Sequence, residues 1–497
     1  MSKRVIVLIV VLVACVGACS GEDSTATHAD KRPNIVLLLT DDLDMAELKF
    51  MPHVERLIAE QGLTFDASYV SNSICCPSRS TILTGRYAHN TGVETNGGGN
   101  GGFEVAHARG IESSTVGTWL QAAGYRTAYI GKYLNGYPHT VAAKYEPPGW
   151  NEWSSAVAGD PYGEYGYTLN RNGKMVEYGR APVDYGTDVY MAQGERFIKS
   201  SRQPFLLYLN VYAPHQPAVP APQDIALFPR AVVPRTASFN EADIADKPAF
   251  VRKTKPLRIR SIDQLYRNRI RSLQAVDRDL VQLVDTLRTS GQLANTYFFF
   301  ASDNGFHLGQ HRLFPGKGTA YETDIRVPLI VRGPGISAGT HTSAPVGNVD
   351  WAETFAALAG ANVPATVDGR SFAAILHHPT TAWPRHAYLL EHWQILADTK
   401  PPPPPGTVLE PLDPNQVIAK ALDITPHFVG IRTARYTYVE YVTGERELYD
   451  NRVDPEQLQN IYATAAPALV GRLHHVVVAL SACQAARCRT AEAVAIP

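Results

Sequence analysis

The sequence predicts an α/β protein: a large domain with a central, mostly parallel sheet flanked by helices, plus a smaller C-terminal domain with an antiparallel sheet. Three observations predict this fold. Short apolar runs without alternation recur along the chain, which is typical of strands buried on both faces of a parallel sheet. Helical patterns lie between these runs. After about residue 374, alternating segments separated by turns take over, which indicates an antiparallel sheet.

The elements follow in order along the chain. Strands are expected at the apolar runs 34–39, 127–130, 205–211, 297–301 and 328–331. Helices are expected near residues 51–61, 115–123, 261–290 and 349–358. In the C-terminal part, residues 428–432 and 435–442 alternate as antiparallel strands do. The proline tract 401–405 predicts a stiff polyproline II excursion, and the Gly-rich stretch 96–102 a loop able to rim a site.

A chain of 497 residues is too long for one ordinary core. We therefore expect the large domain over residues 33–374 and the smaller one over residues 375–497. Hydrophobic residues at 45%, charged residues at 19% and a net charge of −1 give no sign of nucleic-acid binding. The basic stretch 252–271 is predicted to be the solvated face of a helix.

The N-terminus has the pattern of an export signal. Lys3 and Arg4 precede the apolar run 5–13, which is too short to span a bilayer. Residues 16–19, Val-Gly-Ala-Cys, resemble a bacterial lipobox. This pattern predicts a lipoprotein-type signal peptide over 1–18, a membrane anchor through lipid on Cys19 and a tether over 19–32. The expected location is the bacterial cell envelope or, with ordinary cleavage, secretion.

Six cysteines are present, and two lie in this N-terminal signal. Cys483 and Cys488 are five residues apart and can close a small disulfide loop in an oxidising compartment. The remaining pair, Cys75 and Cys76, could form a vicinal disulfide or serve as small buried hydrophobes.

A third interpretation of Cys75 comes from the residues that follow it. Residues 75–86 read Cys-Cys-Pro-Ser-Arg-Ser-Thr-Ile-Leu-Thr-Gly-Arg. Pro77 suits the first turn of a helix, which would place Cys75 at or just before the helix N-terminus. The positive end of the helix dipole makes this a good position for an anion. The run therefore indicates a nucleophile in a site that binds negative charge.

Polar side chains stand at the predicted ends of two strands. Asp41 and Asp42 follow the strand 34–39, and Asp303 and Asn304 follow the strand 297–301. The carboxyl ends of strands form the edge where open α/β sheets hold ligands. Three carboxylates and an amide oxygen suit a hard cation such as calcium or magnesium, whereas zinc prefers histidine or cysteine.

The run from Cys75 to Arg86 resembles the signature of the sulfatase family, C-x-P-S-R-x-x-x-L-T-G-R, at every specified position. Thr-Asp-Asp at 40–42 and Ser-Asp-Asn-Gly at 302–305 are similar to the family's metal-binding segments. Gly-Lys-Tyr-Leu-Asn at 131–135, Ala-Pro-His at 213–215 and Gly-Lys-Gly at 316–318 also fit. The resemblance runs from about residue 33 to residue 490. It implies the alkaline phosphatase superfamily fold and a formylglycine-dependent sulfuric ester hydrolase.

The resemblance also implies roles for individual residues. Oxidation by a formylglycine-generating enzyme would convert Cys75 to an aldehyde, hydrated to a diol that is also a ligand of Ca²⁺, or of Mg²⁺. The other metal ligands would be Asp41, Asp42, Asp303 and Asn304. Arg79 and Lys132 would hold the diol, and His215 and Lys317 would contact the sulfate and the bridging oxygen. One diol oxygen would attack sulfur with Asp303 as base, His215 or Lys317 would protonate the leaving alcohol, and elimination would then release sulfate.

The chain departs from the common family pattern at Leu134. Many sulfatases carry a histidine two residues after the position of Lys132, and that histidine is assigned to the elimination step. The base is here sought among His307, His89 and His311, with His307 favoured because it is close in sequence to the metal pair.

The motif set resembles the branch that contains N-acetylglucosamine-6-sulfatases and heparan endosulfatases, and this implies a sulfated carbohydrate such as a glycosaminoglycan as substrate. Residues 391–393, Glu-His-Trp, are expected at the rim of the site. Three alternatives stay open: an arylsulfatase of broad specificity, a phosphonate or phosphate ester hydrolase on the same scaffold, and a non-enzymatic carbohydrate-binding lipoprotein.

Overall fold

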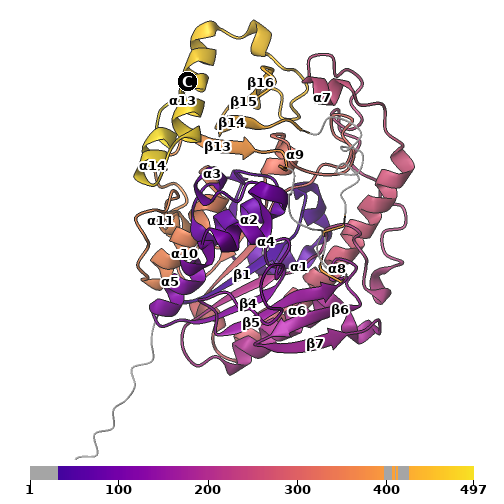
Figure 1. The fold of residues 1–497 in the computed structure, drawn as a ribbon, viewed down its shortest axis with the longest axis vertical. Helices are drawn as coiled ribbons and strands as arrows, with labels where there is room; N and C mark the ends of the chain where they lie inside the picture. Colours follow the sequence, from indigo (N-terminus) through magenta and orange to yellow (C-terminus); the bar gives the residue numbers. More distant parts are fainter. Residues whose placement is uncertain (1–31, 397–405, 409, 412–424, 497) are drawn as a thin grey trace, which may run out of the picture. The chain divides into compact units, whose positions relative to one another are not determined.

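The predicted α/β architecture is confirmed by a computed structural model, which describes residues 32–396, 406–408, 410–411 and 425–496. Ten strands form one sheet in the order β11-β2-β10-β9-β1-β8-β4-β5-β6-β7. Four others form a separate antiparallel sheet in the order β13-β14-β15-β16, and β12 (Val346–Gly347) pairs with β3 (Ser68–Tyr69). Figure 1 shows both larger sheets.

The middle of the large sheet is parallel, and its flanks are mixed. Strands β9, β1, β8, β4 and β5 run parallel to one another. Strand β10 is antiparallel to β9, and β6 and β7 extend the far edge in antiparallel pairs. All five predicted runs are strands. The strands are β1 (Asn34–Thr40), β2 (Leu63–Phe65), β4 (Arg126–Gly131), β5 (Glu152–Gly159), β6 (Tyr167–Arg171), β7 (Lys174–Tyr178), β8 (Phe205–Asn210), β9 (Thr296–Ser302), β10 (Leu329–Arg332) and β11 (Thr340–Thr342).

Helices accompany the large sheet, and three of the four predicted ones have nearly the expected bounds. The fourth, near 51–61, is a short α1 continued by a π-helical turn over Glu55–Ala59. The helices are α1 (Pro52–Val54), α2 (Cys75–Thr84), α3 (Ala88–Thr91), α4 (Gly102–Ala108), α5 (Val116–Ala122), α6 (Gly186–Ser200), α7 (Ala249–Arg252), α8 (Ile259–Thr289), α9 (Glu322–Ile325), α10 (Trp351–Ala359) and α11 (Ala373–His377).

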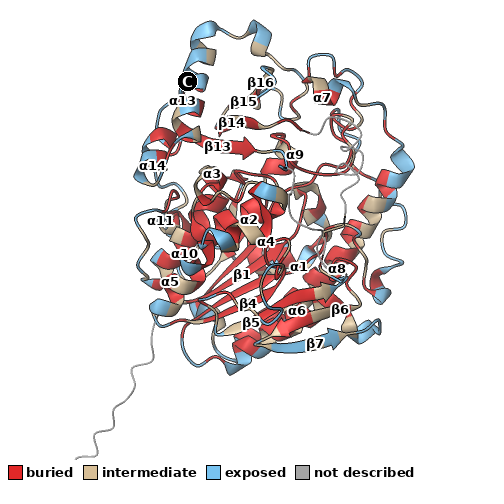
Figure 2. Ribbon diagram, in the orientation of Figure 1, coloured by how far each residue is buried: buried red, intermediate tan, exposed pale blue. Residues whose placement is uncertain are grey.

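Strand β1 divides its side chains between two apolar cores, because successive residues of a strand point to opposite faces. Ile35, Leu37 and Leu39 pack in a core with residues of α2, α5 and α10. Val36 and Leu38 pack in the other with residues of α6 and α8. Figure 2 shows the strands of the sheet buried between these helices. Burial on both faces explains the unbroken apolar run that predicted this strand.

The C-terminal sheet packs with its own helices. Its strands are β13 (Ala387–His392), β14 (Phe428–Thr433), β15 (Tyr436–Tyr441) and β16 (Arg446–Asp450), and its helices are α13 (Pro467–Ser481) and α14 (Ala486–Glu492). The predicted disulfide between Cys483 and Cys488 is present. Arg385, fully buried, joins Asp350 to Glu492 of α14 through paired contacts with both carboxylates.

The basic stretch 252–271 is solvated only in part. Most of its cationic side chains are exposed or half-buried, but Arg269 is fully buried on α8 and its guanidinium contacts Glu47 at 2.7 Å. The expectation of a solvated face is therefore wrong for Arg269.

Several predictions fall outside the described residues: the signal peptide 1–18, the anchor at Cys19, all of the tether except residue 32, and the tract 401–405. Within the described part of the chain, no helix is both long enough and apolar enough for a membrane span. The boundary proposed between the domains at residues 374 and 375 stays a prediction.

Candidate active site

Cys75 is the first residue of α2, as the motif predicted. Ile74 before it is extended, Pro77 lies in the first turn, and every residue of this helix is buried. The Ser78 hydroxyl donates to the carbonyl of Asp303, and Asn348 Nδ2 donates to Ser78 Oγ at 2.8 Å. These contacts tie the helix to the end of β9. Both Cys75 and Cys76 are free thiols, so the vicinal disulfide is not formed.

The predicted acidic residues meet at the carboxyl end of the sheet because β1 and β9 are parallel neighbours. Thr40 pairs with Ser302 in the register of these strands. The backbone N–H of Asp42 donates to Asp303 Oδ1 at 3.2 Å, and Asn304 Nδ2 donates to Asp42 Oδ1 at 2.6 Å. Asp41, Asp42, Asp303 and Asn304 are all buried.

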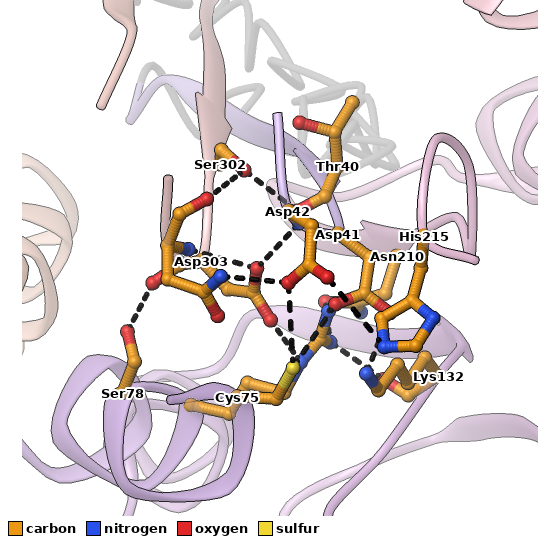
Figure 3. Close-up of polar contacts among 12 residues, drawn as sticks. Thr40, Asp41, Asp42, Cys75, Ser78, Lys132, Asn210, His215, Ser302 and Asp303 are labelled. Atoms are coloured by element: carbon orange, nitrogen blue, oxygen red, sulfur yellow. Dashed lines mark hydrogen bonds and ion pairs between the residues drawn. The ribbon is translucent and has the colours of Figure 1, made fainter. Parts of the chain in front are cut away.

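Three cationic side chains face these carboxylates, as Figure 3 shows in part. Arg79 Nε donates to Asp303 Oδ2 at 2.8 Å, Lys132 Nζ to Asp41 Oδ2 at 2.5 Å, and Lys317 Nζ to Asp42 Oδ1 at 2.5 Å. All three are at least nine-tenths buried. Buried charges persist only when they are paired, and here each carboxylate has its own cation.

Gly131 brings Lys132 into this group. It ends β4 with φ +101°, and a Cβ atom at this position would lie 1.6 Å from the carbonyl oxygen of Asn210. Only glycine allows this approach. The next residue, Lys132, then turns its ammonium group toward Asp41 while its own carbonyl accepts from Arg79 Nη1.

The sulfur of Cys75 lies among the predicted ligands. Lys317 Nζ donates to Cys75 Sγ at 2.7 Å, and the thiol contacts Asp41 Oδ1 at 3.3 Å and Asp42 Oδ1 at 3.7 Å. His215 Nε2 lies 3.5 Å from Asp42 Oδ2. The structure thus brings together Cys75, Arg79, Lys132, His215, Lys317 and the acidic set, which come from distant parts of the sequence.

Burial and neighbouring charges shift the pKa values of the titratable side chains in the site. Burial alone would raise the pKa of Asp41, but Lys132, His215 and Arg79 outweigh it and hold this pKa well below the usual range. Burial raises the pKa of Asp303 to about 6, with Arg79 opposing. Burial and the charge of Asp41 raise the pKa of the Cys75 thiol. Burial would lower the pKa of His215, but Asp42 and Asp41 raise it. The pKa values of Asp41 and Asp303 are thus shifted in opposite directions, although both carboxylates face cations.

The donor set fits a hard divalent cation. Ligand atoms of Asp41 and Asp42 lie within 4.8 Å of each other and of ligand atoms of Cys75 and His215, whose thiol and imidazole are not donors that a hard cation prefers. Asn304 Oδ1 is buried and has no hydrogen-bond partner among the described residues. Carboxylate and amide oxygens are the ligands that calcium and magnesium prefer. The grouping of His215 with the acids was not predicted, because the sequence indicated only its contact with substrate.

The three candidate histidines lie in different settings. His307 Nδ1 lies 2.9 Å from Asp324 Oδ1, and its backbone pairs with Gly316, next to Lys317. His311 Nδ1 contacts Glu241 at 2.6 Å. His89 Nδ1 contacts Glu391 at 2.7 Å. The acids that contact His311 and His89, like Asp324 beside His307, lie outside the site, so these contacts do not distinguish the three histidines as bases. Glu391, expected at the rim, is buried and also accepts from the backbone of Ala88.

Sequence reasoning missed Glu410, Asn96 and Asn135. Glu410 Oε1 lies 2.9 Å from His215 Nε2 and 3.8 Å from Cys75 Sγ. Asn96 and Asn135 donate to its other oxygen. No local pattern marks Glu410, which is 335 residues from Cys75. Asn96, however, lies in the Gly-rich stretch that was expected at the rim, and Asn135 follows the noted departure at Leu134.

The comparisons with known proteins agree with this site. The sequence profile of the Sulfatase family matches residues 33–361. Human N-acetylglucosamine-6-sulfatase is 35% identical, with 96% of this chain and 90% of that protein covered. A Drosophila melanogaster extracellular sulfatase SULF-1 homolog is 38% identical over 73% of this chain, but the chain spans only 33% of its length.

A solved structure is also similar. It is described as a complex with its substrate D-glucosamine-2-N,6-O-disulfate, has a TM-score of 0.73 and 25% identity, and the match covers 90% of this chain and 97% of that one. The motif, the assembled site and these matches lead to one conclusion: the chain belongs to the sulfatase family.

Proposed function

We propose that this protein is a sulfuric ester hydrolase that removes sulfate from a sulfated carbohydrate, with position 75 as formylglycine and a bound divalent cation. The observation that carries the proposal is the position of Cys75: at the start of α2, within 3.7 Å of two carboxylate groups and 2.7 Å of the Lys317 ammonium. A cysteine that only filled space in the core would not need carboxylates and an ammonium group around it. A nucleophile that attacks an anionic ester does, because the negative charge must be offset.

The cation would be held by Asp41, Asp42, Asp303 and Asn304, together with the side chain at position 75. When bound, calcium or magnesium would neutralise negative charge at the reacting oxygens. The buried amide oxygen of Asn304, which lacks a hydrogen-bond partner among the described residues, supports this ligand set.

Formylglycine would supply a hydroxyl of the hydrated aldehyde as nucleophile, after maturation by a formylglycine-generating enzyme. Arg79 and Lys132 would hold that group in place through their contacts with Asp303 and Asp41. Asp303 would accept its proton. Lys317 would bind the sulfate, and His215 would donate a proton to the oxygen of the leaving alcohol.

For the second half of the cycle we keep His307 as the proposed base. Asp324 accepts from its Nδ1 at 2.9 Å, and such a contact fixes the ring and increases the basicity of the other nitrogen. The pairing of His307 with Gly316 places this histidine on the loop that carries Lys317.

The substrate is proposed to be a 6-O-sulfated glucosamine unit, as in glycosaminoglycans. The support is that the human relative is an N-acetylglucosamine-6-sulfatase and that the similar structure holds a disulfated glucosamine as its substrate. Export and anchoring through Cys19 remain predictions.

The test has two parts. Mass spectrometry of the peptide containing residue 75, from protein made in its native host, should show sulfur replaced by oxygen with loss of two hydrogens at Cys75 and not at Cys76. Sulfate release is then measured from N-acetylglucosamine 6-sulfate, from 4-nitrophenyl sulfate and from the matching phosphate and phosphonate esters, with Cys75→Ala as the inactive control.

Faster hydrolysis of the sugar sulfate supports the proposal. Faster hydrolysis of the aryl sulfate would favour a broad arylsulfatase, and faster hydrolysis of the phosphorus esters would favour the phosphonate or phosphate ester hydrolase. An intact thiol in a host that matures other sulfatases would sink the mechanism and favour a carbohydrate-binding protein.

A further inference from the structure

Four donors converge on the carboxylate of Glu410 beside the candidate nucleophile. Its Oε1 contacts His215 Nε2 at 2.9 Å and Lys317 Nζ at 3.5 Å. Its Oε2 accepts from Asn135 Nδ2 at 2.8 Å and from Asn96 Nδ2 at 2.5 Å. The four groups come from separate segments, and together they form a cradle for one anion.

The amide of Asn96 is oriented by a contact that does not involve Glu410. Asn96 Oδ1 accepts from the backbone N–H of Cys76 at 2.7 Å, so its Nδ2 must point the other way, toward the anion. The main chain of Asn135 is held by the backbone N–H of Phe103, which donates to its backbone carbonyl at 2.7 Å, and its Nδ2 also lies 3.5 Å from Tyr162 Oη. Asn135 is 8% exposed, and its Oδ1 has no partner among the described residues. The fold therefore pre-orients the amide of Asn96 and fixes the main chain that carries Asn135.

The location of this cradle suits the anionic end of a substrate. The bound carboxylate oxygen lies 3.8 Å from Cys75 Sγ. A cavity of about 230 Å³ adjoins the cradle, and its lining includes Asn96, Asn135 and Glu410 together with glycines of the Gly-rich stretch. A group held in the cradle would face the nucleophile, and the rest of the molecule would have room in the cavity.

We propose that Asn96 and Asn135 are sulfate-binding residues that, with His215 and Lys317, hold the anionic oxygens of the ester where Glu410 now places its carboxylate. This rests on the proposed function. The two amides add hydrogen bonds without adding charge, so they recognise the oxygens of an already compensated anion. Glu410 is then a tethered competitor, because a second anion in the same cradle would be repelled.

Binding of sodium sulfate, measured by isothermal titration calorimetry on the full-length, calcium-loaded protein, tests the proposal. In Asn96→Ala and in Asn135→Ala the dissociation constant should rise about tenfold, the value of one hydrogen bond to a charged group. In Glu410→Gln it should fall about tenfold or more. Asn268→Ala, on α8 with its side chain bonded to Gln264, is the matched control and should bind as the wild type does.

Two results would overturn the proposal: wild-type sulfate affinity in both asparagine variants, or weaker binding in Glu410→Gln. Melting temperatures check that the variants fold. If Asn135→Ala does not fold, the isosteric Asn135→Asp replaces it, and its carboxylate should abolish sulfate binding; unchanged binding would again contradict the proposal.

Turnover separates this inference from the proposed function. With N-acetylglucosamine 6-sulfate, the asparagine variants should raise KM more than they lower kcat. If no form of the protein hydrolyses sulfate esters but sulfate binding responds as expected, only the proposed hydrolase activity fails. If hydrolysis is seen and the asparagine changes leave sulfate binding unaltered, only this inference fails.

Discussion

The ammonium group of Lys317 lies 2.7 Å from the sulfur of Cys75. Both side chains are buried, and Lys317 also contacts Asp42 at 2.5 Å. Its positive charge is thus held between a candidate metal ligand and the candidate nucleophile.

Replacing this lysine should remove most of the activity. In Lys317→Met, kcat/KM for 4-nitrophenyl sulfate should fall about 100-fold or more, because a fixed charge at a reacting anion is worth several kcal/mol. Lys174→Met, an exposed change on β7, is the control and should retain wild-type kinetics. A loss of less than threefold in Lys317→Met would contradict the role given to this residue.

His307→Gln should slow one half of the reaction. If His307 acts only after the alcohol has left, a rapid first turnover should release one equivalent of 4-nitrophenol, followed by a steady rate at least tenfold below the wild type. Stopped-flow absorbance checks this. A variant whose first turnover slows equally would assign His307 to positioning of the Lys317 loop.

Removal of the cation should abolish activity. Dialysis against EDTA followed by titration with calcium gives the concentration needed for half-recovery, and Asn304→Ala should raise it about tenfold because one oxygen ligand is lost. Asn268→Ala serves again as control. Full activity in the presence of the chelator would contradict the proposed metal site.

The pair of His89 and Glu391 should make stability depend on pH. Burial lowers the pKa of His89, but the contact with Glu391 outweighs it and raises this pKa from 6.5 to about 9. The folded state therefore binds this proton more tightly than the unfolded chain, so the contribution is complete below pH 6.5 and is lost as pH rises through 9. It amounts to at most about 3 kcal/mol.

Urea unfolding at several pH values from 6 to 9.5 measures this loss (roughly the window that the shifted pKa defines). His89→Gln should flatten the dependence, whereas His341→Gln, an exposed histidine 3.0 Å from Asp66, should keep the wild-type slope. Equal slopes in His89→Gln and the wild type would exclude this pair as the cause.

Arg385→Met should destabilise the fold by about 3–5 kcal/mol, because the buried carboxylate of Asp350 would lose its cation and Glu492 would keep only Arg370. Lys199→Met removes an exposed pair with Glu195 and should cost less than about 0.5 kcal/mol. Thermal unfolding followed by circular dichroism compares the two. A similar small loss in both would mean that the buried carboxylates are accommodated by protonation.

The sequence predicted the centre of the sheet better than its edge. The run 34–39 is uniformly apolar because β1 is buried on both faces. Strand β5, which lies between β4 and β6, was not predicted. It carries buried Ser154 and Ser155, and these polar residues interrupt the apolar pattern. Its pairing with β6 depends on contacts that no local pattern encodes.

The sequence likewise predicted some residues of the candidate site and missed others. Asp41 and Asp303 could be placed together because the carboxyl ends of parallel strands share one edge. The motif placed Cys75 at a helix start because Pro77 suits the first helical turn. Glu410 could not be found, since it is 195 residues from His215 in the sequence and no recognisable motif surrounds it.

The guanidinium of Arg79 reaches three further strand ends from α2. It donates to Asp303 after β9, to the carbonyl of Lys132 after β4 and to the side chain of Asn210 at the end of β8. These contacts fix the position of α2, and with it the position of Cys75, relative to the sheet. A core substitution that slides one of these strands by a fraction of an ångström would misalign the reacting atoms while leaving the melting temperature nearly unchanged, so turnover is a more sensitive gauge of strand alignment than stability.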